Sequence, residues 1–446
     1  MMNNKVKDNG ISLPQIPKEK EYEDFIAAIL QAGGYYLERG IIHRIKQDVL
    51  ELDIVTTRFH KDHLEHTISE IKSGGWGFSD IFKVRGWLDY LDLNKATFIV
   101  QEPNQTMEIS KDVAAKINVA LINNENLDCT ELLNVYSIDK NTITEEVIES
   151  YRYAFALEAE MVLYLHCRAK SDPAKQGFQA LEKFLFEINS NSFFENKPVN
   201  RLNKVFRAYK EYKNITARIA EELENKPYPN SGDGLAINKP QFEKIFYKAQ
   251  AKSVLYVALY AELLARLTIL KSCIEDILIG PTTDFSERIQ HFILPENIKN
   301  ALREFLNEPY SYLYPYFWQV FIYLFGGFIL NDKKDEEYKL LSSTTKIPIN
   351  EIPNAFKAFD KLFPLGENKS WFIQQPYTQI TVMQFFPLPL SGIGANFRRI
   401  IYKNDLDASY ENLSKQLSKG HSIDDIIKWN NLAYAFLNSS KRKKKP

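Results

Sequence analysis

The hydrophobic period of this sequence changes near Asn134, and this change limits the folds that the chain can adopt. Before Asn134, short stretches with strand-like alternation are separated by short amphipathic helices. After it, apolar residues recur at helical spacing over long stretches. From Tyr22 to about Asn123 the predicted order is α, β, β, β, α, β, α, β. We therefore predict an α/β domain with a central mixed sheet flanked by helices, followed by a large, mainly α-helical C-terminal region.

The chain has 446 residues, of which 45% are hydrophobic, so it can form more than one core. The stretch from Lys226 to Gly234 is rich in Pro, Gly and Asn and is typical of a linker or exposed loop. The predicted segments are a disordered N-terminus at 1–18, an α/β domain at 19–135, a helical region at 136–226, a helical C-terminal domain at 236–440 and a basic tail at 441–446.

Charge and cysteine content argue against a globally basic nucleic-acid-binding protein and against a disulfide-stabilised one. The 56 basic and 57 acidic residues give a net charge of -1, so any nucleic acid must bind to a local patch. The run Lys441–Lys445 is interpreted as a solvated end, with a phosphate-binding arm as the alternative. Three widely spaced cysteines form no disulfide framework, and Met1–Lys20 lacks the apolar core of a signal peptide. We expect a cytoplasmic protein.

Several local patterns predict helices and their ends. An apolar stripe that begins at Tyr22 indicates a helix ended by Gly33 and Gly34, and Ser79 is predicted to cap a second helix. Thr142–Glu145 has the pattern of a capping box for a helix that runs to about Arg168. The uncharged stretch Pro309–Leu330 favours a buried core helix over a membrane-associated or partner-binding one.

Two neighbouring predicted strands carry the residues that indicate chemistry. Along Val49–Val55, alternation predicts one face with Leu50, Leu52 and Ile54 in a core and the opposite face with Glu51 and Asp53. Along Ile68–Lys72, the same period places Glu70 and Lys72 together and Ile71 on the opposite face.

A hairpin would bring these strands together. If the strands pair through a polar loop at Thr56–His66, then Asp53, Glu70 and Lys72 converge on one side of the sheet. Carboxylates that converge need a counter-ion, and Mg²⁺ is the ion that prefers such oxygen ligands. Such an ion would activate a water and neutralise charge on a phosphate, so the pattern predicts phosphodiester hydrolysis in which Lys72 orients the water.

At these residues the sequence resembles the PD-(D/E)XK nucleases, the restriction-endonuclease-like superfamily, and most closely its Mrr-like branch. The matching elements are Tyr22-Glu23-Asp24-Phe25 on the first helix, Asp53 in the apolar strand, Glu70-Ile71-Lys72 as the E-x-K element, the Gly-containing loop and helix behind it, and the segments 96–100 and 113–122. The resemblance covers about Lys18–Asn134, under a third of the chain.

The resemblance implies roles for individual residues. Asp53 and Glu70 would be metal ligands together with the backbone carbonyl of Ile71, Lys72 would be the catalytic lysine, and Glu23 an accessory acid. The helix after E-x-K departs from the pattern. It carries Lys83 and Arg85 where this branch often has a glutamine.

Weaker candidates lie around this motif. Glu51 is a reserve metal ligand, although an exposed strand residue is the preferred interpretation. Ser73 and Gly74, in a Gly-rich loop, would let a phosphate backbone approach, with contacts from Lys83 and Arg85, or would form a tight turn on which Trp76 packs. The three-residue spacing of His60, His63 and His66 suggests a metal, but a solvated loop is preferred, with phosphate contact as the alternative.

The resulting hypothesis is a Mg²⁺-dependent endonuclease, with Mn²⁺ as an alternative ion, that acts on double-stranded DNA in restriction or phage defence. RNA stays an alternative substrate. The helical region would recognise a target or assemble a dimer or higher homo-oligomer, because a two-strand cut needs two active sites. The competing hypothesis is a non-catalytic module that keeps the fold and binds nucleic acid or protein. We expect no stable insertion into a membrane.

Overall fold

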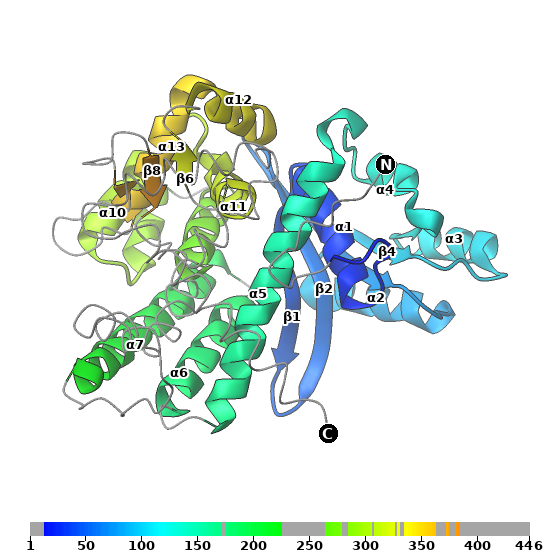
Figure 1. Ribbon diagram of the computed structural model, residues 1–446, viewed down its shortest axis with the longest axis horizontal. Helices are drawn as coiled ribbons and strands as arrows, with labels where there is room; N and C mark the ends of the chain where they lie inside the picture. Colours follow the sequence, from blue (N-terminus) through cyan, green and yellow to red (C-terminus); the bar gives the residue numbers. More distant parts are fainter. Residues whose placement is uncertain are drawn as a thin grey trace, which may run out of the picture.

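Figure 1 shows the computed structural model of the chain, with the α/β sheet between two groups of helices. The structure describes residues 13–171, 175–195, 197–224, 264–278, 284–305, 307–325, 328–330, 334–362, 372–373 and 380–383. The predicted tail at 441–446, residues 1–12, and the whole predicted linker at 226–234 lie outside these ranges.

The first part of the described chain follows the predicted order of helices and strands. Its elements are α1 (Lys20–Ala32), β1 (Tyr36–Arg44), β2 (Asp48–Phe59), β3 (Leu64–Lys72), α2 (Phe78–Leu91), β4 (Ala96–Val100), α3 (Met107–Lys116), β5 (Val119–Asn123) and α4 (Thr130–Val135). The sheet order is β1-β2-β3-β4-β5. The first three strands are antiparallel, and β4 and β5 run parallel to β3, so the predicted mixed sheet is confirmed.

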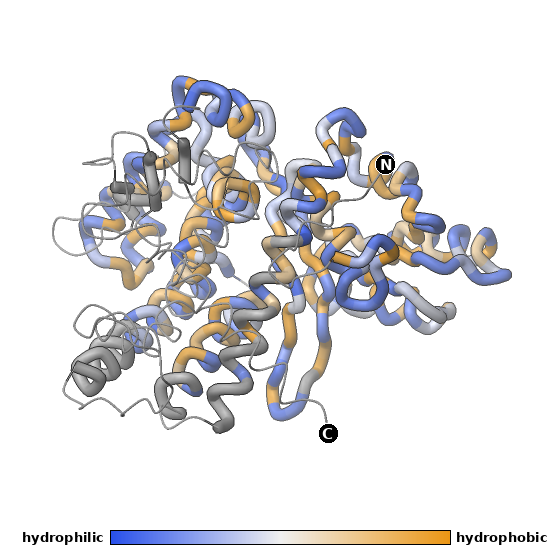
Figure 2. The backbone as a smooth tube through the Cα atoms, in the orientation of Figure 1, coloured by the Kyte–Doolittle hydropathy of each residue, from blue (hydrophilic) through white to orange (hydrophobic). Residues whose placement is uncertain are grey.

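The sheet is covered on both faces, as the residues of its two cores show. On one face Ile54, Ile71, Ile99 and Ile122 pack with α1, α4 and α5. On the other face Leu52, Val55, Ile68 and Phe98 pack with α2 and α3. In Figure 2, apolar and polar segments alternate along both the strands and the helices.

The described residues of the second part of the chain are mainly helical, as predicted. Its larger helices are α5 (Glu145–Ser171), α6 (Lys175–Phe186), α7 (Pro198–Glu224), a helix at 264–278, α10 (Glu296–Phe305), α11 (Tyr314–Phe325), α12 (Lys334–Thr345) and α13 (Ile352–Leu362). A small sheet of β6 (Phe328–Leu330), β7 (Phe372–Ile373) and β8 (Ile380–Met383) was not predicted. The core of these helices is continuous with the α1 face of the large sheet.

Helix α11 packs against the outer strand of that sheet. All twelve of its residues are buried, which confirms the predicted core helix within Pro309–Leu330. Gln319 accepts a hydrogen bond from the Leu37 N–H and donates one to the Leu37 carbonyl, each at 2.8 Å. None of the helices in the described part of the chain has both the length and the apolar character that crossing a bilayer requires.

Three local predictions were wrong in position. Helix α2 starts at Phe78, with Gly77 as its N-cap rather than Ser79. Thr144, not Thr142, accepts the capping hydrogen bond at the start of α5, from the Val147 N–H at 3.3 Å. The predicted polar loop at 56–66 is much shorter, because β2 and β3 stay paired up to Phe59 and Leu64.

A buried ion cluster of Glu38, His66, Arg201, Lys271 and Glu275 joins the sheet to the helical region. Lys271 is fully buried and pairs with Glu38 at 2.8 Å and with Glu275 at 2.7 Å, and Arg201 pairs with Glu275 at 2.9 Å. Burial, together with the nearby Lys271 and Arg201 and against the pull of Glu275, lowers the pKa of His66 to about 4. The imidazole is therefore neutral in the folded protein near pH 7.

We expect this histidine to make the folded state acid-sensitive. Between pH 6.5 and about 4 the unfolded chain takes up a proton on His66 that the folded chain does not, so stability falls as the pH falls. The loss should reach about 3 kcal/mol. Urea unfolding at pH 7 and pH 4.5 measures it, and His66→Gln should show a smaller loss than wild type. Equal losses in the two proteins would contradict the prediction, and His291→Gln, at an exposed position, is the control.

Candidate active site

The candidate site lies where β2 and β3 separate. The pairing of the two strands ends at Ile54 and Ser69, one residue before Asp53 and Glu70. Beyond that point the Asp53 carboxylate takes the place of a strand carbonyl, because its Oδ2 accepts a hydrogen bond from the Ile71 N–H at 2.8 Å. Asp53 is thereby fixed beside the E-x-K segment.

The strand alternation breaks at this same residue. Leu50 and Leu52 pack in the α2 core but Ile54 packs in the α1 core, so the prediction that all three share one face was wrong. Opposite Asp53 in the β1 register is Gly40, whose φ is +57°, a left-handed conformation that a glycine adopts without strain. The side chains of β1 and β2 therefore switch from one face of the sheet to the other at the same point, beside the candidate site.

Glu70 is buried beneath two lysines. Its carboxylate is 2% exposed, and its Oε1 lies 2.5 Å from the Lys72 ammonium and 3.6 Å from that of Lys83. Lys83 also lies over the ring of Trp87, 4.5 Å from its centroid, and is half exposed. The structure thus brings Glu70, Lys72 and Lys83 together, and only the two lysines reach solvent.

The pKa values of Asp53 and Lys72 are both raised, which favours a neutral Asp53 and a charged Lys72. Burial, and then the charges of Glu70 and Glu23, raise the pKa of Asp53 to about 8. For Lys72, burial lowers the pKa, but the hydrogen bond and charge of Glu70, with the charges of Asp53 and Asp80, outweigh it and raise the pKa overall. Lys72 is therefore a permanent cation, and Asp53 is a carboxyl that needs a positive charge to ionise at pH 7.

The carbonyl of Ile71 faces the same gap. Successive residues of a strand direct their backbone groups to opposite sides. The Lys72 carbonyl accepts from the Gln101 N–H on the β4 side, so the backbone groups of Ile71 point to the β2 side, as its hydrogen bond to Asp53 shows. The predicted third oxygen ligand therefore points to the same side as Asp53.

The two candidates for the accessory acid, Glu23 and Glu51, differ in their charge interaction with Asp53 and in their exposure. Glu23, on α1, is close enough for its charge to raise the pKa of Asp53, and it pairs with Lys20 at 2.5 Å. Glu51 is exposed and stands opposite Ile42 in the β1 register. Glu23 is thus the better candidate for the accessory role.

The Gly-rich loop and the following helix contribute less than predicted. Ser73 Oγ accepts a hydrogen bond from the Glu19 N–H at 2.8 Å, so it fastens the loop to α1. Trp76 packs edge-on against Phe98, as the tight-turn alternative predicted. A Cβ built on Gly74 would meet no atom within 4 Å, which leaves the loop approachable there.

Arg85 does not join the candidate site. It forms an ion pair with Asp89 one turn further along α2. Of the two cations predicted on this helix, only Lys83 therefore lies beside Glu70.

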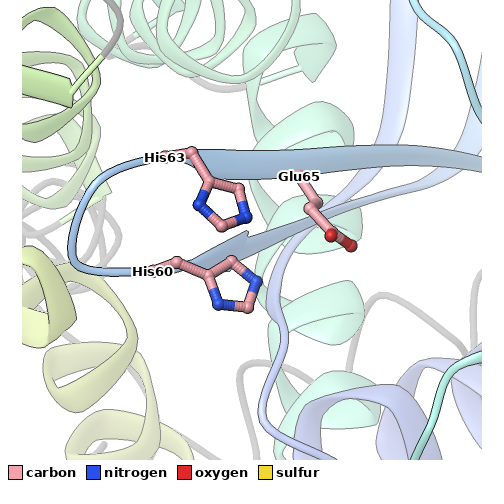
Figure 3. A group of neighbouring side chains, drawn as sticks. All are labelled: His60, His63 and Glu65. Carbon is pink, nitrogen blue, oxygen red and sulfur yellow. The ribbon is translucent and has the colours of Figure 1, made fainter.

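The three histidines of 60–66 do not act as one group. His66 lies in the buried ion cluster, where its Nδ1 is 3.0 Å from Thr57 Oγ1. Glu65, not His66, lies beside His60 and His63 (Figure 3). Glu65 was not predicted from the sequence, because its place beside the imidazoles depends on the register of the hairpin.

A pocket of about 370 Å³ lies elsewhere on the sheet, with Glu65, Lys95, Thr97, Val119 and Tyr136 among its lining residues. Lys95, Thr97 and Val119 lie at the amino ends of β4 and β5, and Glu65 lies at the amino end of β3, whereas the candidate site is at the carboxyl end of β3. The pocket is therefore separate from Asp53 and Glu70.

Comparison with known proteins gives no match: no protein-family model fits the chain, and neither a curated protein nor a solved structure is significantly similar to it.

The donors at the candidate site suit a hard dication. The carboxylates of Asp53 and Glu70, whose charges interact, and the Ile71 carbonyl are all oxygen ligands of the kind that Mg²⁺ selects. Burial, and then the charges of Glu70 and Glu23, raise the pKa of Asp53, so a cation bound beside it would favour the ionised carboxylate. The residues present therefore fit the metal that the sequence pattern implied.

Proposed function

We propose that the chain is a Mg²⁺-dependent endonuclease that hydrolyses phosphodiester bonds of DNA, with a role in restriction or antiviral defence. The observation that carries this proposal is the Asp53, Glu70 and Lys72 cluster at the separation of β2 and β3. Asp53 is held by the Ile71 N–H, and Lys72 is held by Glu70. An ion pair between Glu70 and Lys72 alone has no need of a second carboxyl beside it whose pKa is raised to about 8.

The residues have distinct tasks in the proposed reaction. Asp53, Glu70 and the Ile71 carbonyl would hold Mg²⁺, which supplies an acidified water and neutralises phosphate charge when bound. Lys72 stays protonated, so it acts as a hydrogen-bond donor and not as a base in the resting protein. It orients the attacking water and stabilises the charge that develops on the phosphate oxygens.

Substrate contacts would come from the rim of the site. Lys83, half exposed above Glu70, and the open approach at Gly74 suit a phosphate backbone. The first 135 residues contain 21 acidic and 15 basic residues, so the helical region would supply further phosphate contacts for DNA or RNA. It would also assemble the dimer or higher oligomer that a two-strand cut needs.

A second candidate function has one specific observation in its favour. Glu70 already has two lysine partners, which would satisfy a buried carboxylate in a protein that only binds nucleic acid or a partner. This non-catalytic module would need neither Mg²⁺ nor Lys72 for its function.

Cleavage of supercoiled plasmid by the purified full-length chain tests the proposal. We expect nicked and linear products with Mg²⁺ or Mn²⁺ and none with EDTA. Single-stranded RNA and linear duplex DNA, run in parallel, would identify the substrate class. Binding of plasmid without cleavage in any metal would favour the non-catalytic module.

A further inference from the structure

A second group of metal-ligand side chains lies at the far end of the β2–β3 hairpin. Within the described ranges, His60, His63 and Glu65 are the one set of three or more His, Cys, Asp or Glu residues whose ligand atoms all lie within 4.8 Å of each other. We propose that these three residues bind a divalent transition-metal ion of the zinc class. This site is separate from Asp53 and Glu70 and does not depend on nuclease activity.

The turn itself brings the two imidazoles together. The His60 N–H donates to the His63 carbonyl at 2.9 Å and closes the loop between β2 and β3. The two rings stack, with centroids 4.3 Å apart and planes 6° apart. Glu65 follows His63 by two residues, so strand alternation places it on the same side, as Figure 3 shows. Three ligands thus project from one short turn.

Each of the two imidazoles has a ring nitrogen that could bind a metal ion. His60 Nε2 is buried and has no hydrogen-bond partner among the residues that the structure describes, a costly state for a polar atom. His63 Nδ1 lies 2.8 Å from Asp62 Oδ1, so its proton can be held there and its Nε2 lone pair is free to bind. A carboxylate on the far nitrogen is the usual outer partner of a metal-binding histidine.

The ligand chemistry selects the ion. Two imidazoles and one carboxylate suit Zn²⁺ and its neighbours, whereas Mg²⁺ prefers oxygen ligands alone. Tetrahedral Zn²⁺ with bonds of about 2.0–2.1 Å would need ligand atoms roughly 3.3 Å apart, so both rings must tilt out of their stack when the ion binds. Three protein ligands leave the fourth position for a water.

Two cations moderate the affinity. Lys95 Nζ lies 3.2 Å from Glu65 Oε2, which leaves Oε1 for the metal. The charge of Arg58 also acts on both Glu65 and His60. Removing Lys95 should therefore tighten metal binding by roughly fivefold, because it frees Glu65 and removes a repulsive charge.

The test measures Zn²⁺ by competition with a chromophoric chelator and Co²⁺ by its visible absorption. The full-length chain should carry Asp53→Asn and Glu70→Gln, so that the acidic site binds no metal. We expect one bound equivalent. It should be lost in His60→Ala and His63→Ala, weakened about 10- to 100-fold in Asp62→Asn, tightened in Lys95→Gln and kept in the matched control His291→Ala.

Two outcomes would overturn the site. One is the absence of any bound equivalent in the parent protein, and the other is a His63→Ala protein that binds Zn²⁺ as tightly as its parent. Circular dichroism of each variant confirms folding, and Asp62→Asn and Lys95→Gln alter exposed side chains that are not ligands, so they test the site without removing a ligand.

Discussion

Replacing Lys72 with alanine should lower the rate of DNA cleavage by about 10²- to 10⁴-fold while binding of DNA survives. The ammonium lies 2.5 Å from Glu70 Oε1 and is 32% exposed, so in the proposed reaction it would reach both a carboxylate that would hold the metal and a substrate phosphate. Its loss removes a donor at the reacting phosphate but none of the contacts to the rest of the duplex. Single-turnover cleavage gives the rate, and gel-shift titration in EDTA gives the affinity.

Lys111 provides the matched control for this experiment. It is a lysine paired with a glutamate, Glu131, at 2.9 Å, but on α3 and away from Asp53. Lys111→Ala should cleave at the wild-type rate. Lys83→Ala should instead weaken DNA binding, since Lys83 lies at the rim. If the Lys72→Ala protein cleaved DNA at the wild-type rate, Glu70 and Lys72 would form only a structural ion pair. That result would favour the non-catalytic module.

Replacing Asp53 with asparagine should abolish Mg²⁺ binding and stabilise the metal-free protein by about 1–2 kcal/mol at pH 8–9. The pKa of Asp53 is raised by burial to about 8, so the folded metal-free state keeps a proton that the unfolded state releases near pH 4. This group therefore stabilises the metal-free protein at acidic pH, and its contribution is lost as the pH rises through about 8. Asparagine carries no such charge and can still accept from the Ile71 N–H.

Thermal and urea unfolding, each with and without Mg²⁺, measure both effects. Mg²⁺ at roughly 100 times its Kd should stabilise wild type by about 2–3 kcal/mol and leave Asp53→Asn unchanged. Because the metal needs an ionised Asp53, its affinity in wild type should weaken as the pH falls below about 8, with release of a proton on binding. Equal Mg²⁺ stabilisation of the two proteins would place the ion elsewhere.

The strand order and the core helices could be predicted from the sequence because they depend on local patterns. The apolar stripe of α1 and the glycines that end it are contiguous, and Gly34 adopts the left-handed φ of +102° that such an end requires. The E-x-K segment likewise lies on one strand. These features need no knowledge of distant residues.

The finer geometry of the site could not be predicted, because it depends on pairing across strands. The change of faces at Asp53 is coupled to the left-handed Gly40, thirteen residues earlier on another strand. Glu65 joins His60 and His63 only because β2 and β3 stay paired to the end of the hairpin. Such relations are set by register, which a single sequence does not state.

The contact of Gln319 with Leu37 bears on how copies of this chain can assemble. An outer strand with free backbone groups is a template for another strand, and many proteins join or aggregate by that route. Here a side-chain amide occupies the N–H and carbonyl of Leu37, while Asn189 and Ser190 bond the backbone at Arg39 and Ile42. The helical region thus closes β1 to strand exchange. If the proposed function holds, a dimer that acts on both strands of a duplex would therefore form through helices or through the opposite, β5 side of the sheet.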